Sequence, residues 1–164
     1  MNFDKELTDL AKEVVEKNRI AGRRISTAES CTGGLVAAAL TEIPNASDVL
    51  DRAYVTYSNE AKIEMLGVSE DILATLGAVS EATAWAMAQG ALSRSGADVT
   101  VAISGIAGPG GGTEKKPVGT VVFARALKDE AKGPMVADTH HFGDLGRAEI
   151  RRQAALVALR LLLP

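Results

Sequence analysis

The segment Ser30–Gly34 (SCTGG) carries the first side chains whose types and order suit covalent chemistry. It follows a short strand-like stretch and precedes residues 35–41, which favour a helix. A serine at such a junction is a candidate nucleophile, because free backbone N–H groups at a helix N-terminus can stabilise the oxyanion formed at an attacked carbonyl. The same residues allow a plainer interpretation, in which Ser30 or Thr32 caps the helix and the glycines permit a tight turn.

Cys31, the only cysteine of the chain, is the rival nucleophile. A helix N-terminus lowers the pKa of a thiol and would activate it. Adjacent residues at the end of a strand point in opposite directions, however, so Ser30 and Cys31 are not expected to share one role. Free cysteine commonly packs as a small apolar side chain, and we expect this of Cys31.

Lys62 is a candidate base for the serine. It lies five residues after Tyr57, near the start of a helix that Ser58 is expected to cap. Burial and a helix N-terminus both disfavour a charged ammonium group, so this lysine could accept a proton from the serine, with the tyrosine hydroxyl beside it. The alternative is an exposed lysine paired with Glu60 or Glu64, and a tyrosine that only packs on its strand.

A glycine-rich segment, Ser104–Thr113 (SGIAGPGGGT), directly follows another strand-like run. Successive backbone N–H groups in such a loop can bind a phosphate or a carboxylate, and Lys115 and Lys116 could close over it. The arginines at the start of the last helix, Arg147, Arg151 and Arg152, could reach the same anion, although arginines on a surface helix are usually only solvated. The Walker pattern for nucleotide triphosphates is absent. A surface loop with no ligand is the alternative.

The two histidines, His140 and His141, are adjacent on a predicted strand, so one of them faces inward. A Ser–His–Asp arrangement through the inward histidine therefore stays open. Nothing close to them in the sequence supports a triad, and we expect a histidine packed in the core.

The periodicity of apolar residues predicts the elements that must position these side chains. We expect helices over residues 4–17, 35–41, 59–66, 81–95 and 147–163, and strands over 24–29, 51–57, 98–104, 118–127 and 135–142. Five strands interleaved with helices predict a three-layer α/β/α sandwich on a five-stranded mixed sheet, mostly parallel, with the last two strands antiparallel across the short connection 128–134. Ligands bind at the carboxyl ends of parallel strands, so Ser30–Gly34, Tyr57–Lys62 and Ser104–Gly112 should meet there.

Composition narrows the class of protein. The chain has 164 residues, 46% of them hydrophobic, and a net charge of −3, which predicts one folded domain over residues 1–164 and no general basic surface for nucleic acid. One cysteine and two histidines are too few for a structural zinc site, and we expect no metal and no cofactor. The charged first segment and the short apolar runs predict a cytoplasmic protein with no membrane association.

Several ordered motifs together resemble the CinA C-terminal family. They are TAESCTGG (27–34), YVTYSNEAK (54–62), GAVS (77–80), SGIAGPGGGTEKKPVGTV (104–121) and RRQA (151–154). The resemblance covers about residues 7–162. It implies a three-layer α/β/α sandwich. It also implies the activity of the stand-alone members of the family, which is hydrolysis of the carboxamide of nicotinamide mononucleotide to nicotinic acid mononucleotide and ammonia. Longer members carry a further N-terminal domain, and this chain is expected to be the short form.

The resemblance also implies roles for individual residues. Ser30 would be the nucleophile, Tyr57 and Lys62 would relay its proton to the departing ammonia, and backbone N–H groups around Thr32, Gly33 and Gly34 would hold the oxyanion. Plausible contacts for the substrate phosphate are Gly105, Gly108, Thr113 and Arg147. The family implies a homodimer and neither a metal nor a cofactor.

Two other hypotheses remain. One is a catalytically silent module that binds a nucleotide or a partner in a competence or damage response, which the complete set Ser30, Tyr57 and Lys62 argues against. The other is an amidase whose preferred substrate is a different nucleotide amide, since one fold supports many chemistries.

Overall fold

The computed structural model describes residues 4–130 and 136–164. Its helices and strands follow one another as α1 (Lys5–Ile20), β1 (Ile25–Glu29), α2 (Leu35–Thr41), β2 (Leu50–Val55), α3 (Asn59–Leu66), α4 (Glu70–Leu76), α5 (Glu81–Ser93), β3 (Val99–Gly105), β4 (Thr120–Leu127), β5 (Val136–His141) and α6 (Arg147–Leu161). Short 3₁₀ turns cover Ala46–Asp48 and Lys128–Glu130.

The strands form one sheet in the order β2-β1-β3-β4-β5. Strand β1 pairs in parallel with β2 and β3, whereas β3–β4 and β4–β5 are antiparallel. The mixed five-stranded sheet is confirmed, but the expectation that it is mostly parallel is wrong. The difference lies between β3 and β4, because a glycine-rich loop connects these strands, whereas parallel neighbours are usually connected by a crossover helix.

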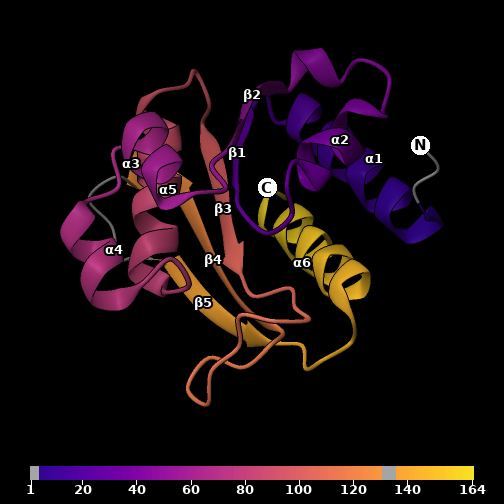
Figure 1. Ribbon diagram of the computed structural model, residues 1–164. Helices are drawn as coiled ribbons and strands as arrows, with labels where there is room; N and C mark the ends of the chain where they lie inside the picture. The colour runs from indigo at the N-terminus through magenta and orange to yellow at the C-terminus, as the bar shows by residue number, and fades with distance from the viewer. Residues whose placement is uncertain (1–3, 131–135) are drawn as a thin grey trace.

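Helices cover both faces of the sheet, which confirms the α/β/α sandwich (Figure 1). Helices α1, α2 and α6 share one apolar cluster on one face, and α3, α4 and α5 enclose a second cluster on the other. Strand β3 is buried along nearly its whole length because it lies between the two clusters. Gly90 in α5 lets α3 pack closely, since a Cβ there would lie 2.0 Å from the carbonyl oxygen of Leu66.

Most predicted elements agree with the structure to within a few residues. Ser58 and Ser80 cap α3 and α5 through side chains that accept from Ala61 N–H and Thr83 N–H, as predicted. The prediction missed α4, although Ser69 caps its start. Residues 131–134 of the predicted connection, and Met135 of the predicted last strand, lie outside the described residues.

Parallel pairing brings the predicted site segments to one edge of the sheet. Strands β1, β2 and β3 end at this edge, where Ser30 N–H donates to the Ile103 carbonyl and Thr56 N–H donates to the Glu29 carbonyl, both at 2.9 Å. The glycine-rich loop joins them through Arg147, which bonds the Gly108 carbonyl. The meeting of the three segments is therefore confirmed.

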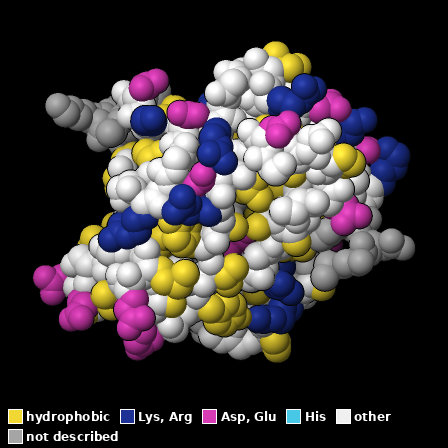
Figure 2. All heavy atoms as spheres, turned by 90° about the horizontal axis from the view of Figure 1, so that it is seen from above, with side chains coloured by type: hydrophobic (Ala, Val, Ile, Leu, Met, Phe, Trp, Pro, Cys, Tyr) yellow, Lys and Arg dark blue, Asp and Glu magenta, His cyan; other side chains and the backbone are white. Residues whose placement is uncertain are grey.

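Acidic and basic side chains are interspersed on the face seen in Figure 2, and no continuous basic patch covers it. Within residues 4–130 and 136–164, none of the helices has the length and apolar character needed to cross a bilayer.

Candidate active site

Ser30 and Lys62 form a buried hydrogen-bonded pair. Lys62 Nζ lies 3.0 Å from Ser30 Oγ, although 32 residues separate them in the chain. Ser30 is 7% exposed and Lys62 is fully buried. The exposed lysine paired with Glu60 or Glu64 is thus excluded, and the first turn of α3 instead directs the ammonium group at the predicted nucleophile.

The other neighbours of Lys62 Nζ are two backbone carbonyls. The nitrogen lies 2.8 Å from the Thr56 oxygen and 3.3 Å from the Tyr57 oxygen. Burial lowers the pKa of Lys62, because the charged form loses hydration that no carboxylate replaces within hydrogen-bonding distance among the described residues. A neutral amine has two N–H donors for the two carbonyls and one lone pair for the Ser30 hydroxyl proton, so the arrangement suits a general base.

Glu29, which the sequence analysis missed, positions the turn that carries Ser30. It is the last residue of β1 and is completely buried. Its carboxylate accepts hydrogen bonds from the Thr32 hydroxyl at 2.7 Å and from N–H groups at the start of α2, those of Gly34, Val36 and Ala37, at 2.9–3.1 Å. A carboxylate at a helix N-terminus is favourable, and here it replaces the side-chain cap that Gly34 cannot supply.

These bonds change the expected oxyanion site. Gly34 N–H donates to Glu29 and Gly33 N–H donates to the Ser30 carbonyl, so neither is free for a substrate. Thr32 is completely buried. Among the described residues the N–H groups of Cys31 and Thr32 donate to no oxygen, and of these two residues only Cys31 retains accessible surface, 6%. The geometry therefore moves the candidate oxyanion donor from Thr32, Gly33 and Gly34 to the backbone of Cys31.

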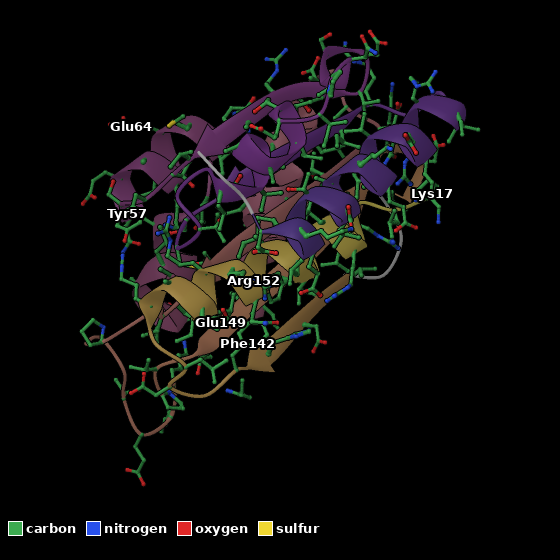
Figure 3. The ribbon with its side chains drawn as sticks, turned by 90° about the vertical axis from the view of Figure 1, so that its right-hand side faces the viewer. Lys17, Tyr57, Glu64, Phe142, Glu149 and Arg152 are labelled. Carbon is green, nitrogen blue, oxygen red and sulfur yellow. The ribbon has the colours of Figure 1, made fainter. Side chains whose placement is uncertain are left out.

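The hydrogen-bond partner of the Tyr57 hydroxyl in this structure is Arg147. The hydroxyl accepts a hydrogen bond from Arg147 Nη2 at 2.9 Å, and the Tyr57 side chain is 60% exposed. Figure 3 shows it at the surface of the molecule. Within the described residues no hydrogen bond joins this hydroxyl to Ser30 or Lys62, so the expected relay through Tyr57 has no formed path in this structure.

The predicted anion-binding residues have different surroundings. Arg147 joins Tyr57 to the glycine-rich loop, since its Nη1 donates to the Gly108 carbonyl at 2.8 Å. Thr113 closes a turn with Lys116. Gly105 faces β4, where a Cβ would lie 2.7 Å from Val121 Cγ2, so a structural requirement explains this glycine.

Comparison with known proteins decides the family. The model of the CinA C-terminal domain matches residues 7–164. The chain belongs to the CinA C-terminal domain family.

Members of the family resemble the chain over different fractions of their length. The nicotinamide-nucleotide amidohydrolase PncC of Escherichia coli K12 is 49% identical over 160 residues, which are 97% of this chain and 94% of that protein. A competence-damage inducible protein of Symbiobacterium thermophilum is 53% identical over 146 residues, but the chain spans only 34% of that longer protein. The crystal structure of the competence/damage inducible protein CihA from Agrobacterium tumefaciens superposes with a TM-score of 0.94 at 48% identity, covering 99% of this chain and 96% of that one.

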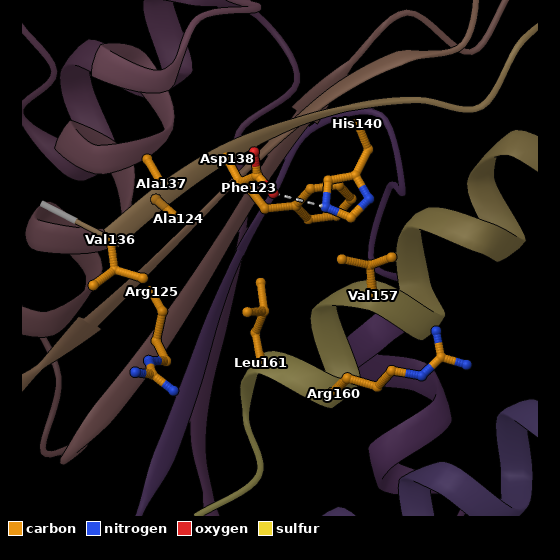
Figure 4. A pocket seen from close by; sticks show the side chains of 10 residues that line it. All are labelled: Phe123, Ala124, Arg125, Val136, Ala137, Asp138, His140, Val157, Arg160 and Leu161. Carbon is orange, nitrogen blue, oxygen red and sulfur yellow. Dashed lines mark ion pairs between the residues drawn. The ribbon is translucent and has the colours of Figure 1, made fainter.

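A cavity of about 310 Å³ lies elsewhere in this CinA-family fold, between α6 and the strands β4 and β5 (Figure 4). Its walls include Phe123, Val136, Val157 and Leu161, and neither Ser30 nor Lys62 lines it. His140 is at this cavity, where it pairs with Asp138 and packs edge-on against Phe123. His141 contacts the Thr120 hydroxyl instead. The triad left open by the sequence is therefore not formed.

Glu29→Gln is expected to lower the free energy of unfolding by about 3 kcal/mol, because an amide loses one acceptor and turns an NH₂ group toward N–H donors. Urea denaturation followed by circular dichroism measures this. The control is Glu60→Gln, in the first turn of α3 and exposed, which should change stability by less than about 0.5 kcal/mol. Equal effects of the two substitutions would contradict the structural role of Glu29.

Cys31→Ala is expected to retain at least about a third of the wild-type kcat. Burial raises the pKa of the Cys31 thiol to about 11, so the reactive thiolate is scarce at neutral pH. The backbone N–H of residue 31 survives the substitution. Steady-state kinetics of amide hydrolysis check this, and a hundredfold loss of kcat would make the thiol, not Ser30, the nucleophile.

Proposed function

We propose that the chain is a serine-type amidohydrolase that converts nicotinamide mononucleotide and water to nicotinic acid mononucleotide and ammonia. The single observation that carries the chemistry is the buried contact between Ser30 Oγ and Lys62 Nζ. The substrate class is supported by the near full-length similarity to a nicotinamide-nucleotide amidohydrolase.

In the first half-reaction, Ser30 Oγ attacks the carboxamide carbon while neutral Lys62 takes the hydroxyl proton. The carbonyl oxygen becomes an oxyanion, which Cys31 N–H stabilises. The Lys62 ammonium then gives its proton to the amide nitrogen, the C–N bond breaks, and ammonia leaves. The product is an ester between Ser30 and the nicotinoyl group.

The second half-reaction returns the enzyme to its starting state. Lys62, neutral again, takes a proton from a water molecule that attacks the ester carbon. The second tetrahedral intermediate collapses, the bond to Ser30 Oγ breaks, and Lys62 returns the proton to that oxygen. The new carboxyl group ionises in solution. One base thus serves both steps, and Tyr57 is left to act with Arg147 in binding the substrate.

Arg147 and the glycine-rich loop are proposed to hold the nucleotide part of the substrate. The guanidinium group already bridges Tyr57 and Gly108 at the edge of the sheet where Ser30 lies. An arginine in such a place suits a phosphate, which it can bind through two parallel hydrogen bonds. Gly105 and Thr113 would then shape the loop, with no direct contact required.

The test is ammonia release by the purified full chain, with nicotinamide mononucleotide and with free nicotinamide at equal concentrations. We expect release from the nucleotide, little from the base, and no change on adding EDTA. Loss of activity in EDTA would contradict the metal-free mechanism. Saturable binding without release would favour the silent binding module, and release only from another nucleotide amide would replace the substrate. The expected homodimer stays a prediction, which light scattering can check.

A further inference from the structure

We infer that Arg151 is a positioning residue for the reaction, which orients and polarises the N–H group that holds the oxyanion. This inference rests on the proposed function. Arg151 lies in the first turns of α6, and its Nε and Nη2 donate to the carbonyls of Cys31 and Thr32 at 3.1 and 3.0 Å. A single guanidinium group thus binds the carbonyl oxygens of two consecutive peptide groups, Cys31–Thr32 and Thr32–Gly33.

Backbone hydrogen bonds connect this arginine to Cys31 N–H. In a planar trans peptide the C=O and the following N–H point in opposite directions. Arg151 binds the Thr32 carbonyl, whose peptide carries the Gly33 N–H, and this N–H donates to the Ser30 carbonyl at 2.9 Å. The Ser30 carbonyl shares its peptide with Cys31 N–H. The series therefore begins at a cation and ends at Cys31 N–H, which donates to no oxygen among the described residues.

Such a series has two physical effects. It prevents the Ser30–Cys31 peptide from rotating, because both peptides in the series have their oxygens bound. It also aligns two peptide dipoles with the arginine charge, and hydrogen bonds in series strengthen one another. Both effects make Cys31 N–H a better donor to a developing negative charge, and they do so before the substrate arrives.

The charge of Arg151 is available for this task. Among residues 4–130 and 136–164 it makes no ion pair with a carboxylate. Its neighbour Arg152 contrasts with it, since that guanidinium group pairs with Asp4, Glu6 and Glu149. Figure 3 shows Arg152 beside Glu149 on α6. Two adjacent arginines on one helix therefore have separate surroundings, and they form a matched pair for an experiment.

The kinetic test compares Arg151→Met with Arg152→Met on nicotinamide mononucleotide. We expect Arg151→Met to lower kcat by about 30- to 100-fold with KM changed less than about threefold, since loss of an oxyanion donor costs about 10²–10³ in kcat. Arg152→Met should lose thermal stability and keep at least half of the kcat. Arg151→Lys keeps the charge but not both bonds, and should fall between Arg151→Met and wild type. A kcat of Arg151→Met equal to that of Arg152→Met would overturn the inference.

A second readout uses pyridine-3-boronic acid, which can add to a serine hydroxyl and place an oxygen where the oxyanion forms. In wild type we expect the Cys31 amide proton to shift downfield in ¹H–¹⁵N spectra on adding this compound. In Arg151→Met or, if that variant does not fold, Arg151→Lys, the shift should shrink and the inhibition constant should rise at least tenfold. Unchanged shift and affinity would overturn the inference.

Failure of the proposed function and failure of the inferred role of Arg151 give different experimental results. Wild type that binds the boronic acid but releases no ammonia from nicotinamide mononucleotide would contradict the proposed substrate, and the spectra would still decide the role of Arg151. Wild type that neither turns over the nucleotide nor shows the Cys31 shift would contradict the serine mechanism, and the role of Arg151 with it.

Discussion

Ser30→Ala is expected to lower kcat for amide hydrolysis by about 10⁴-fold or more, because the attacking oxygen is absent and no acyl intermediate can form. Binding of nicotinamide mononucleotide should persist, since the proposed phosphate contacts lie on Arg147 and the glycine-rich loop. Ammonia release measures the first effect and titration calorimetry the second.

The matched control for this substitution is Ser80→Ala. Ser80 caps α5, so its loss should cost about 1 kcal/mol of stability and leave kcat near the wild-type value. This control separates loss of the hydroxyl at the proposed nucleophile from loss of a structural serine elsewhere. A Ser30→Ala protein that hydrolyses the amide at a rate close to that of Ser80→Ala would rule out Ser30 as the nucleophile.

Lys62→Met is expected to lower kcat by about 10³-fold, because general-base catalysis contributes about 10²–10⁴-fold. Met fills the space of the lysine chain but leaves the Thr56 and Tyr57 carbonyls without their donor, so some loss of stability should accompany the loss of activity. Lys12→Met, on the exposed side of α1, is the control and should match wild type in both respects.

The pH dependence of kcat/KM tests the protonation state of Lys62. Only the neutral amine can take the serine proton, so activity should rise with pH through the pKa of Lys62. Burial lowers that pKa, and the midpoint should fall below the ordinary lysine value of about 10.4. Residual activity of Lys62→Met should lack this rise. If kcat/KM of Lys62→Met still rises with pH at the same midpoint as in wild type, the titrating group is not Lys62.

Local sequence was enough to predict the elements that carry the site. Serine caps, strand-forming runs and glycines at turns act within a few residues, so α2, α3 and the start of α5 follow from the chain itself. The sequence also predicted that the ends of β1, β2 and β3 meet, because parallel strands place their carboxyl ends at one edge of the sheet. The sequence did not predict how many strand pairs are parallel and how many antiparallel, since this depends on which strands become neighbours in the sheet.

The burial and the hydrogen-bond partners of the candidate site residues could not be predicted from local sequence. Lys62 near Glu60 and Glu64 has the pattern of a solvated helix face, and only the packing of α3 against the sheet buries it beside Ser30. Tyr57 shows the converse, because its position beside Lys62 in the chain predicted a relay, whereas its hydroxyl points to Arg147 from the distant α6.

The sequence by itself therefore determined the fold class, the family and the turn that carries the candidate nucleophile, since these depend on residue types at short spacing. Only the tertiary structure decided which groups surround that turn. Glu29 accepts hydrogen bonds from N–H groups at the start of α2, and Arg151 binds the carbonyls of Cys31 and Thr32 across 120 and 119 residues of chain. Hydrogen-bond satisfaction is a property of the folded surroundings, so contacts between elements far apart in the chain decided which N–H groups of this turn have an oxygen partner.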